Sequence, residues 1–137
     1  MCIRDSDTAF NVVIRDTLDQ NLDFSTLNII HSSHRSELRA NIQDSKYITF
    51  DFQNILLPDS TVDFNGSQGF VTYSIEANEG IPENTEIRNT ASIFFDFNPP
   101  IVTNTTLNTM VSCFPVEEQF IEAAINEGEI YLSLIHI

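Results

Sequence analysis

The chain has 137 residues, 42% of them hydrophobic with 11 Phe and no Trp, which suits one domain with a real core. Its 6 Lys and Arg against 20 Asp and Glu give a formal net charge of −14. A chain this acidic repels phosphate backbones and has no basic membrane patch, which argues against nucleic-acid partners. No run of about eighteen apolar residues is present, so no transmembrane span is predicted.

The first six and last six residues can be encoded by one DNA segment read from opposite strands. Met1 to Ser6 can be encoded by ATG TGT ATA AGA GAC AG, and the reverse complement, CTG TCT CTT ATA CAC AT, encodes Leu132 to Ile137. This inverted repeat is typical of transposase adapters used for sequencing libraries. We therefore interpret residues 1–6 and 132–137 as adapter artefact and expect neither a true start nor a true stop. Sequencing the native gene through both ends tests this interpretation.

Between these ends, apolar residues alternate with polar ones at the period of β-strands. The positions that share one face are Phe10, Val12, Ile14; Leu38, Ala40, Ile42; Ile48, Phe50, Phe52; Val71, Tyr73, Ile75; and Ile87, Asn89, Ala91, Ile93, Phe95, Phe97. A weaker strand is expected near Leu22 to Ile30, and a further one in the Thr-rich stretch from Ile101 to Val111.

Turn residues separate these runs, as at Pro58–Asp59, Asn65–Gly66 and Asn98–Pro99–Pro100. Long helical patterns do not lie between the strands, which argues against a parallel α/β sheet. Short strands with one apolar and one polar face predict an all-β, antiparallel β-sandwich.

After Pro115 the chain changes character, and residues 113–131 are expected to be a linker and the start of a following module. Val116 to Ile125 has the spacing of a short helix, and it equally suits a linker and first strand. With Cys2 set aside, Cys113 alone makes no internal disulfide or metal cluster. It is either buried or paired with a cysteine outside this chain.

Two segments resemble a known family. Asp7 to Leu18, DTAFNVVIRDTL, resembles the front of the conserved repeat domains of unknown function in bacterial surface proteins. Ile87 to Thr105, IRNTASIFFDFNPPIVTNT, looks like the closing signature of a variant common in large Bacteroidetes-type secreted proteins. The resemblance covers roughly Asp7 to Val111.

This resemblance implies an immunoglobulin-like β-sandwich over residues 7–112, exported to the extracellular space or cell surface, often with type IX secretion. The family usually has a strand before the Asp7–Thr8–Ala9 segment, so the sandwich is expected to lack its first edge strand and to expose a sheet edge.

Candidate chemistry is sparse. His31 and His34 bind a metal only if further ligands such as Glu37 and Asp44 converge on them. The chain has no nucleophile elbow and no glycine-rich phosphate loop, so no enzyme, catalytic residue or cofactor is predicted. The acidic loops leave calcium binding open, and its candidate ligands are Asp51, Asp59, Asp63 and Asp96.

Three acidic–hydroxyl–apolar triplets resemble the O-glycosylation sites of Bacteroidetes-type organisms, with Thr8, Thr17 and Ser60 as acceptors. The alternative is that Asp-Thr and Asp-Ser pairs simply end strands, where Asp16 and Thr17 satisfy free backbone groups. Mass spectrometry of the native protein distinguishes the two.

The sequence as a whole predicts a structural spacer in a row of modules, whose partners are the neighbouring modules of the same chain. The alternative is a carbohydrate- or protein-binding adhesin module that contacts its ligand through loops such as His31–Arg35 or Asn65–Gln68. Most aromatic residues lie in predicted strands rather than loops, which favours the spacer.

Overall fold

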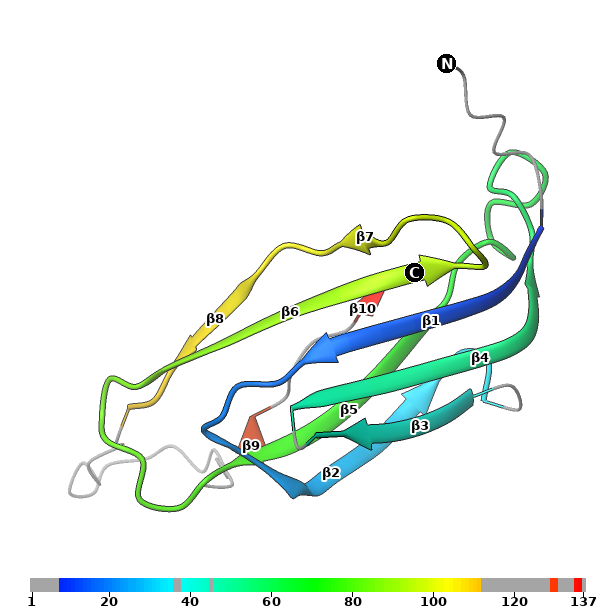
Figure 1. The fold of residues 1–137 in the computed structure, drawn as a ribbon. Helices are drawn as coiled ribbons and strands as arrows, with labels where there is room; N and C mark the ends of the chain where they lie inside the picture. Colours follow the sequence, from blue (N-terminus) through cyan, green and yellow to red (C-terminus); the bar gives the residue numbers. More distant parts are fainter. Residues whose placement is uncertain (1–7, 36–37, 45, 112–128, 131–134, 137) are drawn as a thin grey trace, which may run out of the picture.

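The computed structural model describes residues 8–35, 38–44, 46–111, 129–130 and 135–136, and it forms two antiparallel β-sheets packed as a sandwich (Figure 1). Several predicted segments lie outside the described residues: the stretch 1–6 interpreted as adapter, Cys113, and the predicted linker and following module apart from residues 129–130. Of the stretch 132–137, also interpreted as adapter, the structure describes residues 135–136.

The larger sheet has the strand order β3-β4-β1-β6-β7, with β8 also paired to β6. Its strands are β1 (Ala9–Thr17), β3 (Leu38–Gln43), β4 (Tyr47–Leu57), β6 (Glu86–Phe95), β7 (Ile101–Val102) and β8 (Thr106–Thr109). The edges of β1 are taken by β4 on one side and β6 on the other. A strand that preceded β1 would therefore have to pair elsewhere.

The smaller sheet has the order β10-β5-β2, with β9 also paired to β5. It consists of β2 (Leu22–Ser32), β5 (Phe70–Ala77), β9 (Glu129–Ile130) and β10 (Ile135–His136). Residues 8–111 thus contribute only β2 and β5 to this sheet. The fold is the predicted all-β antiparallel sandwich and is consistent with an immunoglobulin-like arrangement.

The core lies between the two sheets and follows the predicted alternation. Fully buried side chains come from β1, β2, β4, β5 and β6, and they include Val12, Ile14, Leu22, Ile48, Phe50, Phe52, Val71, Tyr73, Ile75 and Ile87. The rings of Phe50 and Tyr73 meet across the core with centroids 5.4 Å apart. Contacts of this kind join the sheets because each strand turns every second side chain inward.

Four predicted inward positions are wrong. Phe10 is exposed because the register of β1 against β4 shifts between Ala9 and Asn11. Phe97 is fully exposed because β6 ends at Phe95 and Asp96 takes a left-handed φ of 49°. Ala40 and Ile42 are also exposed, since β3 is an edge strand whose residues are mostly exposed.

Two further predicted strands are present with different bounds. The weak strand near Leu22 is the 11-residue β2, and the stretch from Ile101 to Val111 holds two short strands, β7 and β8. Within the described ranges, no helix is long and apolar enough to span a membrane.

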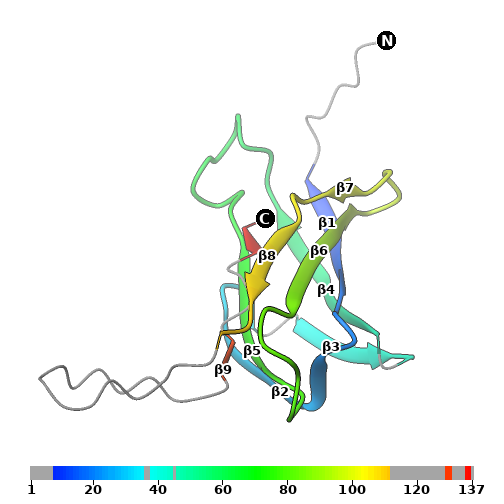
Figure 2. The same ribbon diagram turned by 90° about the vertical axis from the view of Figure 1, so that its left-hand side faces the viewer.

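The chain enters and leaves the sandwich at opposite ends of β6. Val12, near the start of β1, lies opposite Phe95 at the end of β6. Thr109, at the end of β8, lies opposite Glu86 at the beginning of β6. Figures 1 and 2 show the start of β1 and the end of β8 at opposite ends of the sandwich. We call these the β1 end and the β8 end.

Candidate functional site

A buried polar network joins the two sheets inside the core. The Asp16 carboxylate on β1 accepts a hydrogen bond of 2.6 Å from the Tyr73 hydroxyl on β5. The same Oδ2 atom accepts a bond of 3.1 Å from the Asn89 Nδ2 on β6. Among the described residues, Asp16 Oδ1 and Asn89 Oδ1 have no partner. Since buried polar groups are costly without partners, this network fixes how β1, β5 and β6 face one another.

The network changes the proton affinity of both acidic groups. Burial raises the pKa of Asp16, and the hydrogen bonds from Tyr73 and Asn89 lower it by less. Burial, together with the neighbouring Asp16 charge, raises the pKa of Tyr73 far above its ordinary range, so Tyr73 remains a hydrogen-bond donor. No counter-ion contacts this carboxyl within the described chain. Asp16 and Tyr73 have no exposed surface and Asn89 has almost none, so the arrangement suits a structural contact between the two sheets.

The network was missed at the sequence level, where Asp16 was interpreted as a strand-ending residue. Its side chain instead lies in the core with no exposed surface. The signal was the alternation itself, because Asp16 continues the Val12 and Ile14 face, and Asn89 lies between Ile87 and Ala91 on another inward face. When a polar residue occupies a position that the alternation assigns to the inward face of a strand, it indicates a buried polar contact.

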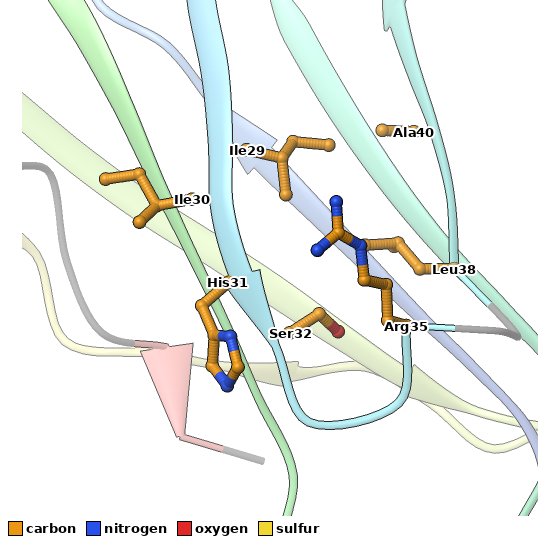
Figure 3. A pocket seen from close by; sticks show the side chains of 7 residues that line it. All are labelled: Ile29, Ile30, His31, Ser32, Arg35, Leu38 and Ala40. Atoms are coloured by element: carbon orange, nitrogen blue, oxygen red, sulfur yellow. The ribbon is translucent and has the colours of Figure 1, made fainter.

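A surface pocket lies between the edge strands of the two sheets, β2 and β3 (Figure 3). It has a volume of about 210 Å³ and is lined by Ile29, Ile30, His31, Ser32, Arg35, Leu38 and Ala40. Figure 3 shows the Arg35 guanidinium beside Ile29 and Leu38, on the same side of β2 as the Ser32 hydroxyl. Ile30 and His31 project to the other side of that strand.

The polar groups of the pocket are partly unpaired. Ser32 is buried, and its hydroxyl has no hydrogen-bond partner among the described residues. Within that same part of the chain, Arg35 is in no salt bridge. The His31 ring instead lies 5.2 Å from the Phe70 ring. The pocket therefore combines an apolar wall with a guanidinium that is in no salt bridge and a hydroxyl that has no hydrogen-bond partner among the residues that the structure describes.

Of the predicted metal ligands, Glu37 lies outside the described residues, and the two histidines have separate partners. His31 packs on Phe70, whereas the His34 Nδ1 is 2.9 Å from the Ser33 hydroxyl. In the described ranges, no three His, Cys, Asp or Glu side chains form a metal-binding group.

All four candidate calcium ligands accept hydrogen bonds from other described residues, and for Asp51, Asp59 and Asp63 the donors are near in sequence. Asp51 accepts one from Gln53, Asp59 accepts two from Thr61, and Asp63 accepts one from the Gly66 amide. Asp96 accepts bonds from the Phe10 and Asn11 amides, at 3.0 Å and 2.8 Å, and so attaches the start of β1 to the end of β6.

The predicted glycosylation acceptors lie apart from the pocket and the network. Thr8 precedes β1, Thr17 ends it, and Ser60 lies in the loop between β4 and β5. Thr17 and Ser60 are exposed, whereas Thr8 is half-buried. The Asp59–Ser60–Thr61 turn is held by the Asp59 carboxylate, and these hydrogen bonds lower the pKa of Asp59. O-glycosylation at these positions stays a prediction.

Comparison with known families places the chain. A family model described as a domain of unknown function, DUF7619, matches residues 4–109, which is more than half of the chain. The chain belongs to the DUF7619 family. The match spans the DUF7619 sandwich from β1 to β8 and includes Asp16, Tyr73, Asn89 and the pocket. No curated protein and no solved structure matches the chain.

Proposed function

We propose that this DUF7619 domain is a structural spacer in a larger secreted or cell-surface bacterial protein, as an immunoglobulin-like repeat of Bacteroidetes-type, type IX-sorted proteins. The observation that carries the proposal is the position of the two chain ends along β6. A strand rises about 3.3 Å per residue, so the 10 residues of β6 separate the β1 end from the β8 end by roughly 30 Å. Modules joined at such ends extend in line.

The β1 end carries an apolar surface that suits contact with a preceding module. Large exposed hydrophobic side chains are present at the start of β1, at the end of β4, in the loop after it and just past β6. They are Phe10, Leu56, Val62, Phe64 and Phe97. Scattered exposed apolar residues are ordinary, but several at one end of a domain indicate an interaction surface.

One of these residues is held there at a conformational cost. Leu56 has a φ of 52°, in the left-handed region that bulky residues avoid, and Asn54 has a φ of 59°. The left-handed conformation costs roughly 1–2 kcal/mol for a residue with a side chain. Strain of this kind is typical of functional surfaces, and here it presents a leucine to the solvent beside the point where the chain enters.

The proposal predicts the length of two consecutive modules. We expect small-angle scattering of a protein with two copies of residues 7–111 in a row to show a maximum dimension greater than that of one copy by at least about 30 Å. Replacing Phe64 and Phe97 with Ser should increase the flexibility of the pair, whereas replacing exposed Thr17 and Gln53 with Ser should not. A two-module particle as compact as a side-by-side dimer would contradict the spacer.

The second candidate is a carbohydrate-binding adhesin module, and the pocket between β2 and β3 favours it. Arg35 offers a guanidinium to a carboxylate, and Ser32 offers a hydroxyl, beside the aliphatic wall of Ile29 and Leu38. A volume of about 210 Å³ suits one sugar unit. The chain as a whole has a charge of −14, so a pocket that places a guanidinium beside a ligand offers a local positive charge that favours an acidic sugar over a neutral one.

This candidate predicts a measurable preference for a sugar acid. In NMR titrations of the full chain, we expect glucuronate to shift the amides of Ser32 and Arg35, and glucose to bind at least about ten-fold more weakly. Arg35→Gln should abolish the preference. Arg39→Gln is the matched control, because Arg39 is exposed on β3 and does not line the pocket. Equal shifts with glucose and glucuronate would exclude an acidic-sugar site.

A further inference from the structure

The edge of the larger sheet at β3 is open and regular. Among the described strands, β3 pairs with β4 alone, and its register runs from Leu38 to Gln43 without a shift (Figure 1). By contrast, β2 shifts its register against β5 twice, and β7 is a strand of 2 residues that follows Pro99 and Pro100. Bulges, prolines and very short strands protect a sheet edge from pairing, and β3 has none of these features.

The backbone groups that β3 presents at this edge belong to Leu38, Ala40 and Ile42. The Leu18 amide donates to the Lys46 carbonyl, so the even-numbered residues of β1 direct their backbone groups to β4. They pair with even-numbered residues of β4, which leaves the odd-numbered residues of β4 to bond to the odd-numbered residues of β3. Because direction alternates along a strand, the even-numbered residues of β3 point away from the sheet.

The two faces of this edge differ in their chemistry. Leu38, Ala40 and Ile42 lie opposite core residues of β4, so their side chains form an apolar strip on the core-facing side, where Ala40 and Ile42 are exposed. Arg39 lies on the other face, opposite Asp51 of β4, and in the part of the chain that the structure describes neither is in a salt bridge. A strand added here would direct alternate side chains to the apolar strip and to the guanidinium.

The charge around β3 is opposite to that of the whole chain. Residues 35–46 contain Arg35, Arg39 and Lys46, which are half of the 6 cationic residues, but only two of the 20 acidic ones. A positive segment in a chain of charge −14 attracts acidic partners and repels cationic ones. A second copy would bring its own Arg39 to the edge together with its own charge of −14, so charge disfavours pairing of β3 with itself.

We propose that the β3 edge binds an acidic extended polypeptide of another protein, which adds to the larger sheet as a further strand. Its main chain pairs with the outward groups of Leu38, Ala40 and Ile42, its apolar side chains cover the strip, and its acidic side chains lie beside Arg39. In such strand addition, main-chain hydrogen bonds give affinity and alternate side chains give specificity. The proposal goes beyond the spacer and is independent of the sugar pocket, because the backbone of β3 holds the ligand.

NMR titration of the full chain with a peptide of alternating Val and Glu tests the proposal. We expect the amides of Leu38, Ala40 and Ile42 to shift, and at saturation their exchange with solvent should slow at least about ten-fold because they become paired. A peptide of alternating Val and Gln can form the same ladder without the charges, and it should bind at least about three-fold more weakly. Equal affinities for the two peptides would overturn the proposed acidic preference.

Two variants separate the backbone contribution from the charge contribution. Ala40→Pro removes an outward donor but no bond to β4, since an edge strand tolerates proline where the missing N–H faces solvent. It should weaken binding of the Val–Glu peptide at least about ten-fold and leave the circular dichroism spectrum unchanged. Arg39→Gln should weaken the same peptide about two- to five-fold and leave the Val–Gln peptide unaffected.

The matched control is Arg88→Gln, because Arg88 lies on β6 and pairs with Glu86 away from the β3 edge. It should leave the affinity for both peptides unchanged. Equal weakening by Arg39→Gln and Arg88→Gln would overturn the proposal, as would peptide binding that shifts no amide of β3. Shifts of the β3 amides with protein concentration alone, in the absence of peptide, would instead identify a second copy as the occupant and would also overturn it.

Discussion

Replacing Phe50 with Ala should lower the free energy of unfolding by about 3–5 kcal/mol, the range for deleting a fully buried aromatic ring. Phe50 has no exposed surface and meets the Tyr73 ring of the opposite sheet at 5.4 Å. The substitution leaves a cavity between the sheets that β-strands on both sides cannot collapse to fill. Since small domains have only about 5–15 kcal/mol of stability, the loss is a large part of the total.

Chemical denaturation followed by circular dichroism measures this effect, and Phe97→Ala is the matched control. Phe97 is a ring of the same size that lies wholly outside the core, so its loss should change the stability by less than about 0.5 kcal/mol. Equal losses for the two variants would show that the sandwich does not pack as described.

Asp16→Asn should make the protein more stable than the unaltered chain as the pH rises above the ordinary carboxyl pKa of 3.8. Burial raises the pKa of Asp16 in the folded state, so over this window the folded chain binds more protons than the unfolded chain. Its contribution to stability is fully present below 3.8 and is lost as the pH rises through the folded-state pKa. Asparagine keeps the shape and an acceptor for Tyr73, but never ionises.

The measurement is the difference in unfolding free energy between the variant and the unaltered chain at several pH values. Within the window the difference should grow by at most about 1.4 kcal/mol per pH unit. Asp23→Asn is a control of opposite sign, because hydrogen bonds from Ser25 lower the pKa of the partly exposed Asp23. The stability that Asp23 contributes is present above 3.8 and is lost as the pH falls. If the difference in unfolding free energy between Asp16→Asn and the unaltered chain did not change with pH, this would contradict the raised pKa of the buried Asp16.

The sequence is sufficient to predict the class of fold, because inward-facing runs such as Ile48–Phe52 and Val71–Ile75 repeat with period two. It is not sufficient to predict which side chains face inward where a register shift or a left-handed residue interrupts the alternation of a strand. The shift after Ala9 turns Phe10 outward, and the left-handed Asp96 ends β6 before Phe97. Local departures of this kind depend on pairing between distant strands, which a single sequence does not encode directly.

The sequence likewise predicts part of each candidate site, and the rest depends on how the strands pack. The loop His31–Arg35 was predicted as a binding loop, and three of its polar residues, His31, Ser32 and Arg35, line the pocket. The aliphatic half comes from Ile29 on β2 and Leu38 on β3, which belong to different sheets, so the packing of the two sheets brings them together. For the Asp16 network, the alternation indicated an inward side chain, but the identity of its partners requires the packing of two sheets.

The position of β1 and β8 on either side of β6 has a mechanical consequence. Both strands run antiparallel to β6, and the chain leaves them at opposite ends. A pulling force applied through Thr8 and Val111 therefore acts along the strands, and it loads the hydrogen bonds of both ladders together instead of opening them one at a time. Resistance to tension then depends on the number of bonds that β6 shares with its two neighbours.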